Sequence, residues 1–254
     1  MVCQLCRLSW RGSSFLCAGE SVDSCKDSIR LTGGFLVILT TNRYTRANTK
    51  TMSNTTHKKL NAYIFIGRSG CGKGTQAELL TKKLRECDPD IKIMHVESGN
   101  ELRKFAKEDN YSAAITKKVL AEGGLMPEFM PMYLWGKLFV SGFTGNETTI
   151  FDGTPRKLME AKVLDSLFPF YGIEKPWVIY LDVDHEESTK RLKGRGRADD
   201  TEEAIKKRMA WYENDVRPSV EFYRTNPNVM FLDIDGEQSI DEVHADIVKK
   251  VGLV

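Results

Sequence analysis

From residue 59 to the C-terminus, short apolar runs alternate with longer segments in which apolar side chains recur every three or four residues. The runs predict five strands, at residues 62–66, 92–96, 148–152, 177–183 and 229–234. They are nearly continuous rather than alternating, which is typical of strands covered on both faces. Strands that alternate with helical patterns predict an α/β fold with a five-stranded parallel sheet.

Two of the intervening segments carry the spacing of a helix capping box. Asp200 precedes Glu203 by three residues, and Ser239 precedes Glu242 by the same distance. After Ser239, apolar side chains fall on one helical stripe, at Val243, Ile247 and Val251. Helices are therefore expected to begin near residues 200 and 239.

Residues 1–58 lack this alternation, and residues 41–57 form a polar run with no helical or strand period. We expect residues 1–58 to be a disordered N-terminal extension, with Met52 as a candidate downstream start, and residues 59–254 to form one domain. The alternative is an organellar import signal in residues 1–50. Residues 1–19 favour it, because they hold two arginines and three serines but no acid.

Composition narrows the class of protein. The 254 residues are 41% hydrophobic and 28% charged, which is ordinary for a globular protein. The net charge of +2 gives no general reason to expect nucleic acid or an acidic membrane as a partner. Four of the six cysteines lie within residues 1–25 rather than across the chain, which favours a reducing compartment over a disulfide-stapled secreted protein. We expect a cytoplasmic monomer.

The first predicted strand leads into a glycine-rich turn, Gly67-Arg68-Ser69-Gly70-Cys71-Gly72-Lys73-Gly74-Thr75, and then into a helical pattern. Glycines let backbone N–H groups approach a phosphate closely. The helix adds its positive N-terminal end, and Lys73 adds a charge that can reach terminal phosphates. Gly74 departs from the usual pattern, because a serine or threonine hydroxyl is expected there. Alone, this turn predicts a site for a nucleoside triphosphate.

Arginines follow three of the other predicted strands. Ligands of an open parallel sheet bind at the carboxyl ends of its strands. Arg103 follows the second strand and Arg156 the third, while Arg195, Arg197 and Arg208 follow the fourth. Guanidinium groups bind phosphate oxygens bidentately and can neutralise charge on a phosphoryl group in transfer. A second anion site is therefore expected beside the glycine-rich turn.

From about residue 60 to its end, the chain resembles the adenylate kinases and related nucleoside monophosphate kinases. The motifs that carry the resemblance are Gly67-x-x-Gly-x-Gly-Lys-Gly-Thr75, Ser98-Gly-Asn-x-x-Arg103, Asp152-Gly-x-Pro-Arg156 and the set of Arg195, Arg197 and Arg208. In this family the Gly-Thr ending after the lysine is the normal form. The resemblance implies a P-loop NTPase-type three-layer fold with a monophosphate-binding arm at about residues 97–126 and a short lid at residues 194–200.

The resemblance also implies the reaction ATP + NMP = ADP + NDP, with AMP as the leading acceptor and GMP, CMP or UMP as alternatives. ATP would be bound by Gly70, Cys71, Gly72, Lys73, Gly74, Thr75, Arg195 and Gly236. The monophosphate would be bound by Ser98, Arg103, Gly124, Leu125, Met126, Gly153, Arg156, Glu160, Arg197 and Arg208. The charges expected to act on the reacting phosphoryl group are those of Lys73, Arg156, Arg195, Arg197 and Arg208.

Such a transfer needs no general base, because the attacking phosphate oxygen is already ionised at pH 7. Mg²⁺ would bridge the ATP phosphates and keep most of its waters. Asp152 is the candidate for holding that water shell, with capping of the following turn as its alternative role. No cysteine follows Cys87, which excludes the long zinc-bearing lid of some relatives.

The acceptor base stays open, because adenylate kinases generally have threonine where Ser98 stands and glutamine where Glu160 stands. A glutamine amide can donate to adenine N1 and accept from its N6 amino group, whereas an ionised glutamate only accepts. A carboxylate pairs better with the adjacent N1–H and N2 amino donors of guanine, or with the amino group of cytosine.

Two functions without nucleoside monophosphate transfer remain as alternatives. One is an ATP-binding regulator without catalytic activity, which would have no use for Arg103, Arg156 and Arg197 around a second anion. The other is a kinase for a small metabolite, against which the Asp-Gly-x-Pro-Arg run at residues 152–156 speaks. A GTPase would need an Asn-Lys-x-Asp base reader, which the sequence lacks.

Overall fold

The structure, a computed structural model, describes residues 31–32, 35–36, 60–197 and 200–253. The chain divides into two units, Met1–Thr56 and His57–Val254. In the first unit, β1 (Leu31–Thr32) and β2 (Phe35–Leu36) pair as antiparallel strands. The rest of the predicted extension and the alternative import signal lie outside the described residues, so both stay predictions.

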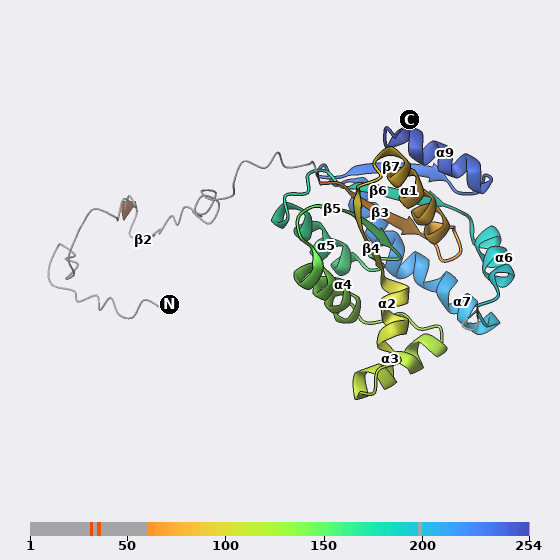
Figure 1. The fold of residues 1–254 in the computed structure, drawn as a ribbon. Coiled ribbons are helices and arrows are strands. Elements are labelled where there is room, and N and C mark those ends of the chain that lie inside the picture. Colours follow the sequence, from red (N-terminus) through yellow and green to blue (C-terminus); the bar gives the residue numbers. More distant parts are fainter. Residues whose placement is uncertain (1–30, 33–34, 37–59, 198–199, 254) are drawn as a thin grey trace. The chain divides into compact units, whose positions relative to one another are not determined.

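A five-stranded parallel sheet forms the centre of the second unit (Figure 1). The strands lie in the order β4-β5-β3-β6-β7. Their bounds are β3 (Ala62–Gly67), β4 (Lys92–Glu97), β5 (Glu147–Asp152), β6 (Trp177–Asp182) and β7 (Met230–Asp235). Every strand lies within one residue of its predicted bounds, which confirms the α/β prediction.

Helices cover both faces of this sheet and make a three-layer fold. One face packs against α1 (Lys73–Cys87) and α9 (Ile240–Lys250). The other packs against α4 (Phe129–Gly142), α5 (Leu158–Phe170), the π-helix η2 (Tyr212–Val216) and α8 (Arg217–Arg224). Four further helices complete this unit: α2 (Ser98–Phe105), α3 (Tyr111–Ala121), α6 (His185–Arg195) and α7 (Glu202–Trp211).

The central strand shows why its sequence is continuously apolar. Ile64 and Ile66 pack into the core under α4 and α5, whereas Tyr63 and Phe65 pack under α1 and α9. Successive side chains of a strand point to opposite faces, so a strand between two helical layers needs apolar residues at every position. Burying each such side chain stabilises the fold by about 1.5–3 kcal/mol.

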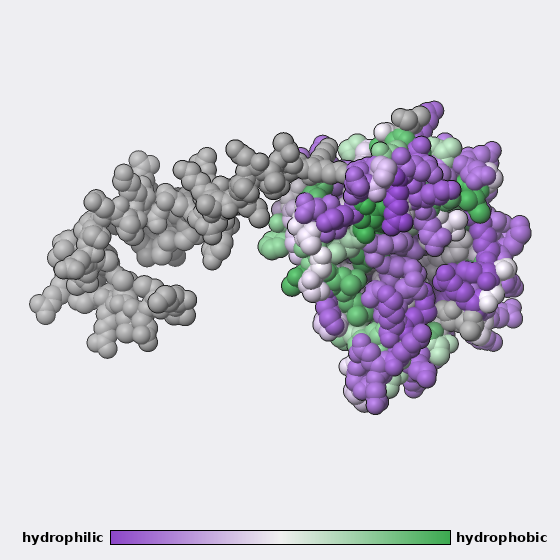
Figure 2. All heavy atoms as spheres, in the orientation of Figure 1, coloured by the Kyte–Doolittle hydropathy of each residue, from purple (hydrophilic) through white to green (hydrophobic). Residues whose placement is uncertain are grey.

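The two edge strands correct the expectation that all five are covered on both faces. β4 and β7 are largely half-buried or exposed, and each has one fully buried side chain, Val96 and Ile234 respectively. In the view of Figure 2, polar side chains cover α2 and α3, while apolar patches lie over α4 and α5. Among the described residues, no helix is long and apolar enough to cross a bilayer.

Of the two predicted capping boxes, one is confirmed and one is wrong. Ser239 and Glu242 exchange hydrogen bonds at the start of α9, where the Ser239 amide donates to Glu242 Oε2 at 3.0 Å. At α7 the capping residue is Thr201, whose hydroxyl oxygen accepts from the Ala204 amide at 3.2 Å. Asp200 instead forms ion pairs with Arg195 and Arg208, because a buried carboxylate needs cationic partners.

Candidate active site

The turn between β3 and α1 forms one end of a cavity of about 510 Å³, a size typical of small-molecule sites. Gly70 has φ of +88°, and a Cβ there would lie 2.6 Å from the carbonyl oxygen of Ser188. Gly72, with φ of +97°, directly precedes α1. Gly70 therefore passes against α6 at a point where a side chain would clash, and the N–H groups of the first helical turn open onto the cavity.

Lys73 holds the loop together through its ammonium group. Its Nζ donates to the carbonyl oxygens of Gly67 and Arg68 at 3.0 and 2.8 Å, and it lies 3.4 Å from Cys71 Sγ. The Cys71 side chain is buried in the core under α1. The cationic charge of Lys73 is thus placed at the loop, at the cavity wall.

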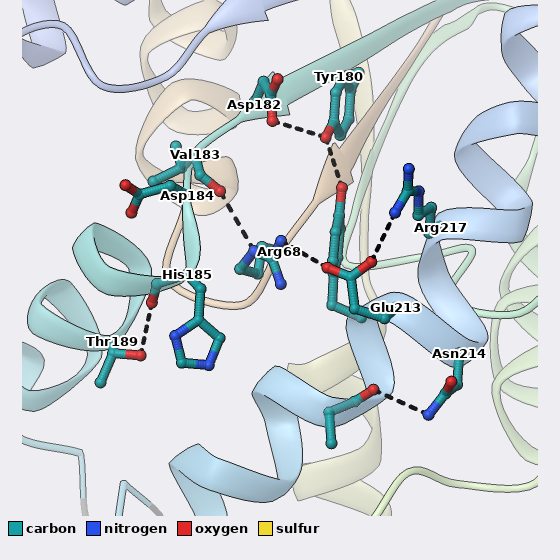
Figure 3. A network of polar contacts seen from close by, with 12 residues as sticks. Arg68, Tyr180, Asp182, Val183, Asp184, His185, Thr189, Glu213, Asn214 and Arg217 are labelled. Atoms are coloured by element: carbon teal, nitrogen blue, oxygen red, sulfur yellow. Dashed lines mark hydrogen bonds and ion pairs between the residues drawn. The ribbon is translucent and has the colours of Figure 1, made fainter.

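Arg68 belongs to the same loop but does not line the cavity. Figure 3 shows its polar contacts. Its Nε donates to the carbonyl oxygen of Val183 at 3.3 Å, and its Nη2 pairs with Glu213 at 3.0 Å. The guanidinium lies 3.8 Å from the centre of the Tyr212 ring, a cation–π contact. The Tyr212 hydroxyl is 2.5 Å from that of Tyr180. These contacts fasten the loop to β6 and η2.

The opposite end of the cavity is built from side chains at the ends of β4 and β5. The Ser98 hydroxyl donates to the Gly153 carbonyl oxygen at 2.6 Å, and Arg156 Nε donates to the same oxygen at 2.9 Å. Arg103 is held by Glu97 at 3.3 Å and by the Asn100 side-chain oxygen at 2.6 Å. Two guanidinium groups therefore face the phosphate loop across one cavity.

A smaller cavity adjoins this end and shares Gly153 and Arg156 with the large one. Glu160, on the first turn of α5, lines it and is 2% exposed. The Arg156 amide donates to Glu160 Oε2 at 2.8 Å, and the Thr154 hydroxyl donates to Oε1. Burial raises the pKa of Glu160, and these hydrogen bonds together with the Arg156 charge offset the rise only in part.

In and beside the predicted lid, residues 194–200, two of the predicted arginines, Arg195 and Arg208, bind the carboxylate of Asp200. Arg195 donates to both Asp200 oxygens at 2.7 and 2.9 Å, and Arg208 Nη1 donates to Asp200 Oδ1 at 2.6 Å. The Asp200 side chain is 3% exposed. Burial alone would raise the pKa of Asp200, but Arg195 and Arg208 bring it below its ordinary value. Arg197 is exposed and lines the large cavity.

Most of the predicted site residues meet in these cavities. The large cavity is lined by Gly70, Cys71, Gly72, Lys73, Gly74, Thr75, Arg103, Asp152, Gly153, Arg156, Arg195, Arg197 and Gly236. The smaller one adds Ser98, Leu125, Met126 and Glu160. Arg208 lines a third space behind the loop, with Lys73 and Arg156. Gly124 lines none of these three cavities; its amide donates to the Val119 carbonyl oxygen at 2.8 Å.

The structure also adds residues that the sequence did not single out. Arg191 donates to the Gly236 carbonyl oxygen at 2.9 Å, and Gln76 donates to that of Ile240 at 2.9 Å. Arg191 precedes Arg195 by one helical turn, so its position on the same face of α6 could have been predicted from the sequence. The other cavity residues follow from how the loops pack: Ser69, Glu97, Gly99, Gln238, Ser239, Ile240 and Val243.

The described residues contain no group of three or more histidine, cysteine or acidic side chains able to hold a metal ion. Two carboxylates line the large cavity, Glu97 and Asp152. Glu97 is engaged by Arg103 and Asn100. Asp152 lies at the end of β5 and faces the loop, with its Oδ2 3.2 Å from where a Cβ on Gly74 would stand. A glycine at position 74 thus leaves room between loop and carboxylate.

Comparison with known proteins adds an independent finding. A sequence model of the family described as adenylate kinase matches residues 65–228. The adenylate kinase of Azobacteroides pseudotrichonymphae is 33% identical over 196 residues, which cover 76% of this chain and 97% of that protein. Adenylate kinase 1 of a Nostoc species is 32% identical over 189 residues, or 74% and 97%. The adenylate kinase of Bacteroides fragilis is 33% identical over 196 residues, or 76% and 98%.

Proposed function

This chain belongs to the adenylate kinase family of nucleoside monophosphate kinases, and from that premise we propose that it transfers the terminal phosphoryl group of ATP to AMP, forming two ADP. One observation carries the proposal. A single cavity is lined at one end by the phosphate loop and at the other by Arg103 and Arg156. Two facing anion sites suit a donor triphosphate and an acceptor monophosphate held for direct transfer.

The donor end would hold ATP mainly through the loop. The backbone N–H groups of residues 70–75 would bind its phosphates, and Lys73 would reach the terminal ones. Arg195 would contact the same phosphates from the lid. Gly236, whose carbonyl oxygen is fixed by Arg191, would lie beside the adenine.

The acceptor end would hold the monophosphate by side chains. Arg103, Arg156, Arg197 and Arg208 would bind its phosphate. Its base would enter at the smaller cavity, which has a volume of about 10 Å³ in this structure, about the size of one water molecule, and would have to widen to admit it. That cavity is lined by Ser98, Leu125, Met126, Gly153 and Glu160. Gly124, predicted with this group, would contribute only by placing the backbone of the next residue, Leu125, which lines the smaller cavity.

Transfer would need position and charge rather than a proton carrier. The acceptor's phosphate oxygen is ionised at neutral pH, so it can attack the terminal phosphorus of ATP directly. Lys73 and the surrounding guanidinium groups would neutralise the charge that develops on the phosphoryl oxygens. Movement of the lid over the cavity would exclude water, which could otherwise take the phosphoryl group.

Mg²⁺ fits this cavity as a companion of ATP rather than as a resident metal. It prefers oxygen ligands and binds through one or two carboxylates together with substrate phosphates. Asp152 is the carboxylate that faces the loop. When bound, the ion would neutralise phosphate charge, and Asp152 would hold its water shell.

GMP and CMP are the alternative acceptors that a specific observation favours, because an ionised Glu160 would accept hydrogen bonds from guanine or cytosine better than from adenine. The decisive experiment is an assay of the full chain with Mg-ATP and each of AMP, GMP, CMP and UMP. We expect ADP formation with AMP to exceed that with the other three. A lack of acceptor-dependent ADP with all four would refute the kinase, and a preference for GMP would move the function to that acceptor.

A further inference from the structure

Glu160 is a buried acid that phosphoryl transfer itself does not use. It is 2% exposed and lines the smaller cavity, where its carboxyl group accepts from the Arg156 amide and the Thr154 hydroxyl. The Lys157 backbone also hydrogen-bonds to this carboxyl group. The two oxygens of a carboxyl group offer about four hydrogen-bonding sites, so one remains for a ligand once the cavity, now about 10 Å³, widens to admit it.

We propose that Glu160 is protonated when the acceptor is bound and recognises adenine as a neutral carboxylic acid. This rests on the proposed function, in which the acceptor's base enters the smaller cavity. Binding of AMP would then take up a proton from solution. Glu160 would be a specificity-determining residue whose preference depends on its protonation state.

The hydrogen-bonding edges explain why the neutral acid fits. Adenine presents the N1 acceptor beside the N6 amino donor, and a neutral carboxyl presents an O–H donor beside a carbonyl acceptor. The two edges are complementary. An ionised carboxylate offers only acceptors, so it would leave N1 unpaired and repelled. A buried unpaired acceptor costs about 1–3 kcal/mol.

The surroundings favour the proton. The smaller cavity is walled by Leu102, Leu125 and Met126, and such apolar walls disfavour a charged carboxylate. Burial raises the pKa of Glu160 even before a ligand binds. The hydrogen bonds from the Arg156 amide, the Thr154 hydroxyl and the Lys157 backbone, together with the Arg156 charge, lower this pKa and offset the rise only in part. An acceptor phosphate on Arg156 would neutralise that cation, so AMP binding itself would strengthen proton retention.

Other charged or titratable groups lie near Glu160 or its partner Arg156. Asp152, at the end of β5, acts on the charge of Arg156. Lys157 lines the smaller cavity with Glu160 and pairs with Glu128 at 3.4 Å. From α8 comes Tyr223, whose hydroxyl donates to the Ala161 carbonyl oxygen at 3.2 Å. Burial raises the pKa of Tyr223 well above its ordinary value, so this tyrosine stays neutral over the working pH range.

The sign of the pH dependence follows from linkage. Above the pKa of Glu160 in the free enzyme, AMP must bring a proton with it, so its dissociation constant should rise about tenfold per pH unit. ATP binding at the other end of the cavity should not share this dependence. Glu160→Gln should remove it, because an amide offers the same donor and acceptor at every pH.

The test is calorimetric titration of AMP into the full chain from about pH 6.5 to about pH 9.5, a range that includes the values known for buried glutamates. Each titration is run in two buffers with different heats of ionisation, which reports proton uptake directly. Asp165→Asn is the matched control. Asp165 lies on the same helix and burial also raises its pKa, but it lines neither cavity.

We expect proton uptake and weakening of AMP at alkaline pH in the wild type and in Asp165→Asn, and neither in Glu160→Gln. Equal profiles in wild type and Glu160→Gln would overturn the inference. So would AMP affinity in the wild type that stays constant to about pH 9.5, a result that needs no variant to fold. If ADP forms from AMP but AMP affinity does not depend on pH, the inference is refuted and the proposed function stands. Failure to bind or convert AMP at any pH would refute the proposed function.

Discussion

The two ends of the large cavity are built in different ways. The donor end is built mainly from one contiguous stretch, residues 69–75, in which backbone groups and the start of α1 face the cavity. The acceptor end and the smaller cavity beside it are assembled from side chains of distant segments, including Ser98, Arg103, Arg156 and Glu160. One end is made by backbone shape, and the other by convergence of side chains.

This difference explains why the two ends are not equally specific. Backbone N–H groups and a helix N-terminus recognise phosphate, which every nucleoside triphosphate carries. Side chains recognise a base through their particular donors and acceptors. A single exchange, such as a carboxyl for an amide at position 160, can therefore change the acceptor while the donor end stays the same.

Asp200 connects the two ends, because it binds Arg195 of the predicted donor set and Arg208 of the predicted acceptor set. Its carboxylate occupies guanidinium groups that phosphates would otherwise engage. The lid is thus held by an ion-pair network that a pair of nucleotides could rearrange.

The largest expected effect comes from removing Lys73, the charged side chain of residues 69–75 at the donor end. Lys73→Ala should lower kcat/KM by about a thousandfold, because it removes a positioned cation from the reacting phosphoryl group. Steady-state ADP formation measures this. Thermal unfolding should remain cooperative, and near-normal turnover would contradict the assigned role of Lys73.

The connection between the ends is tested next. Asp200→Asn should lower the free energy of unfolding by about 3 kcal/mol, because two arginines lose a buried counter-charge. Urea denaturation of wild type and variant at neutral pH measures the difference. The folded-state pKa of Asp200 lies below its ordinary value. The stabilisation is therefore full above about pH 4 and is lost as pH falls through that folded-state pKa. An equal difference at all pH values would contradict the ion-pair explanation.

The acceptor end should respond more mildly to a change that keeps its charge. Arg156→Lys should raise the KM for AMP about tenfold, because a lysine loses the paired hydrogen bonds of a guanidinium while it keeps the cation. The KM for ATP should hardly change. Arg224→Lys is the matched control, since Arg224 pairs with Asp233 on the exposed edge of β7. Equal changes in both KM values would contradict the separation of the two ends.

The smallest effect is expected outside both ends. Deletion of residues 1–51 should leave kcat, both KM values and the melting temperature unchanged. The core clusters of the described residues begin at Leu60, and the family match begins at residue 65. Kinetics and thermal unfolding of the shortened chain measure this. A loss of activity would show that the extension contributes to the site.

Local features of the sequence were enough for the framework and the donor end. The five apolar runs predicted the strands. For the three central strands the reason is that a strand between two helical layers needs apolar residues on both faces. The glycine-rich turn was recognisable because its parts are consecutive. The Ser239 box was correct because both of its members lie within one helical turn.

Only the tertiary structure decided the contacts between distant side chains. Asp200 has the spacing of a helix cap but pairs with Arg195 and Arg208. A buried carboxylate is stabilised more by cations than by a backbone N–H group. Arg68 belongs to the loop motif but contacts Tyr212 and Glu213 of η2 instead of the cavity. The sequence alone could show that position 160 carries an acid. That this acid is buried beside Arg156, with its pKa raised, follows from packing, because desolvation depends on the walls around a group.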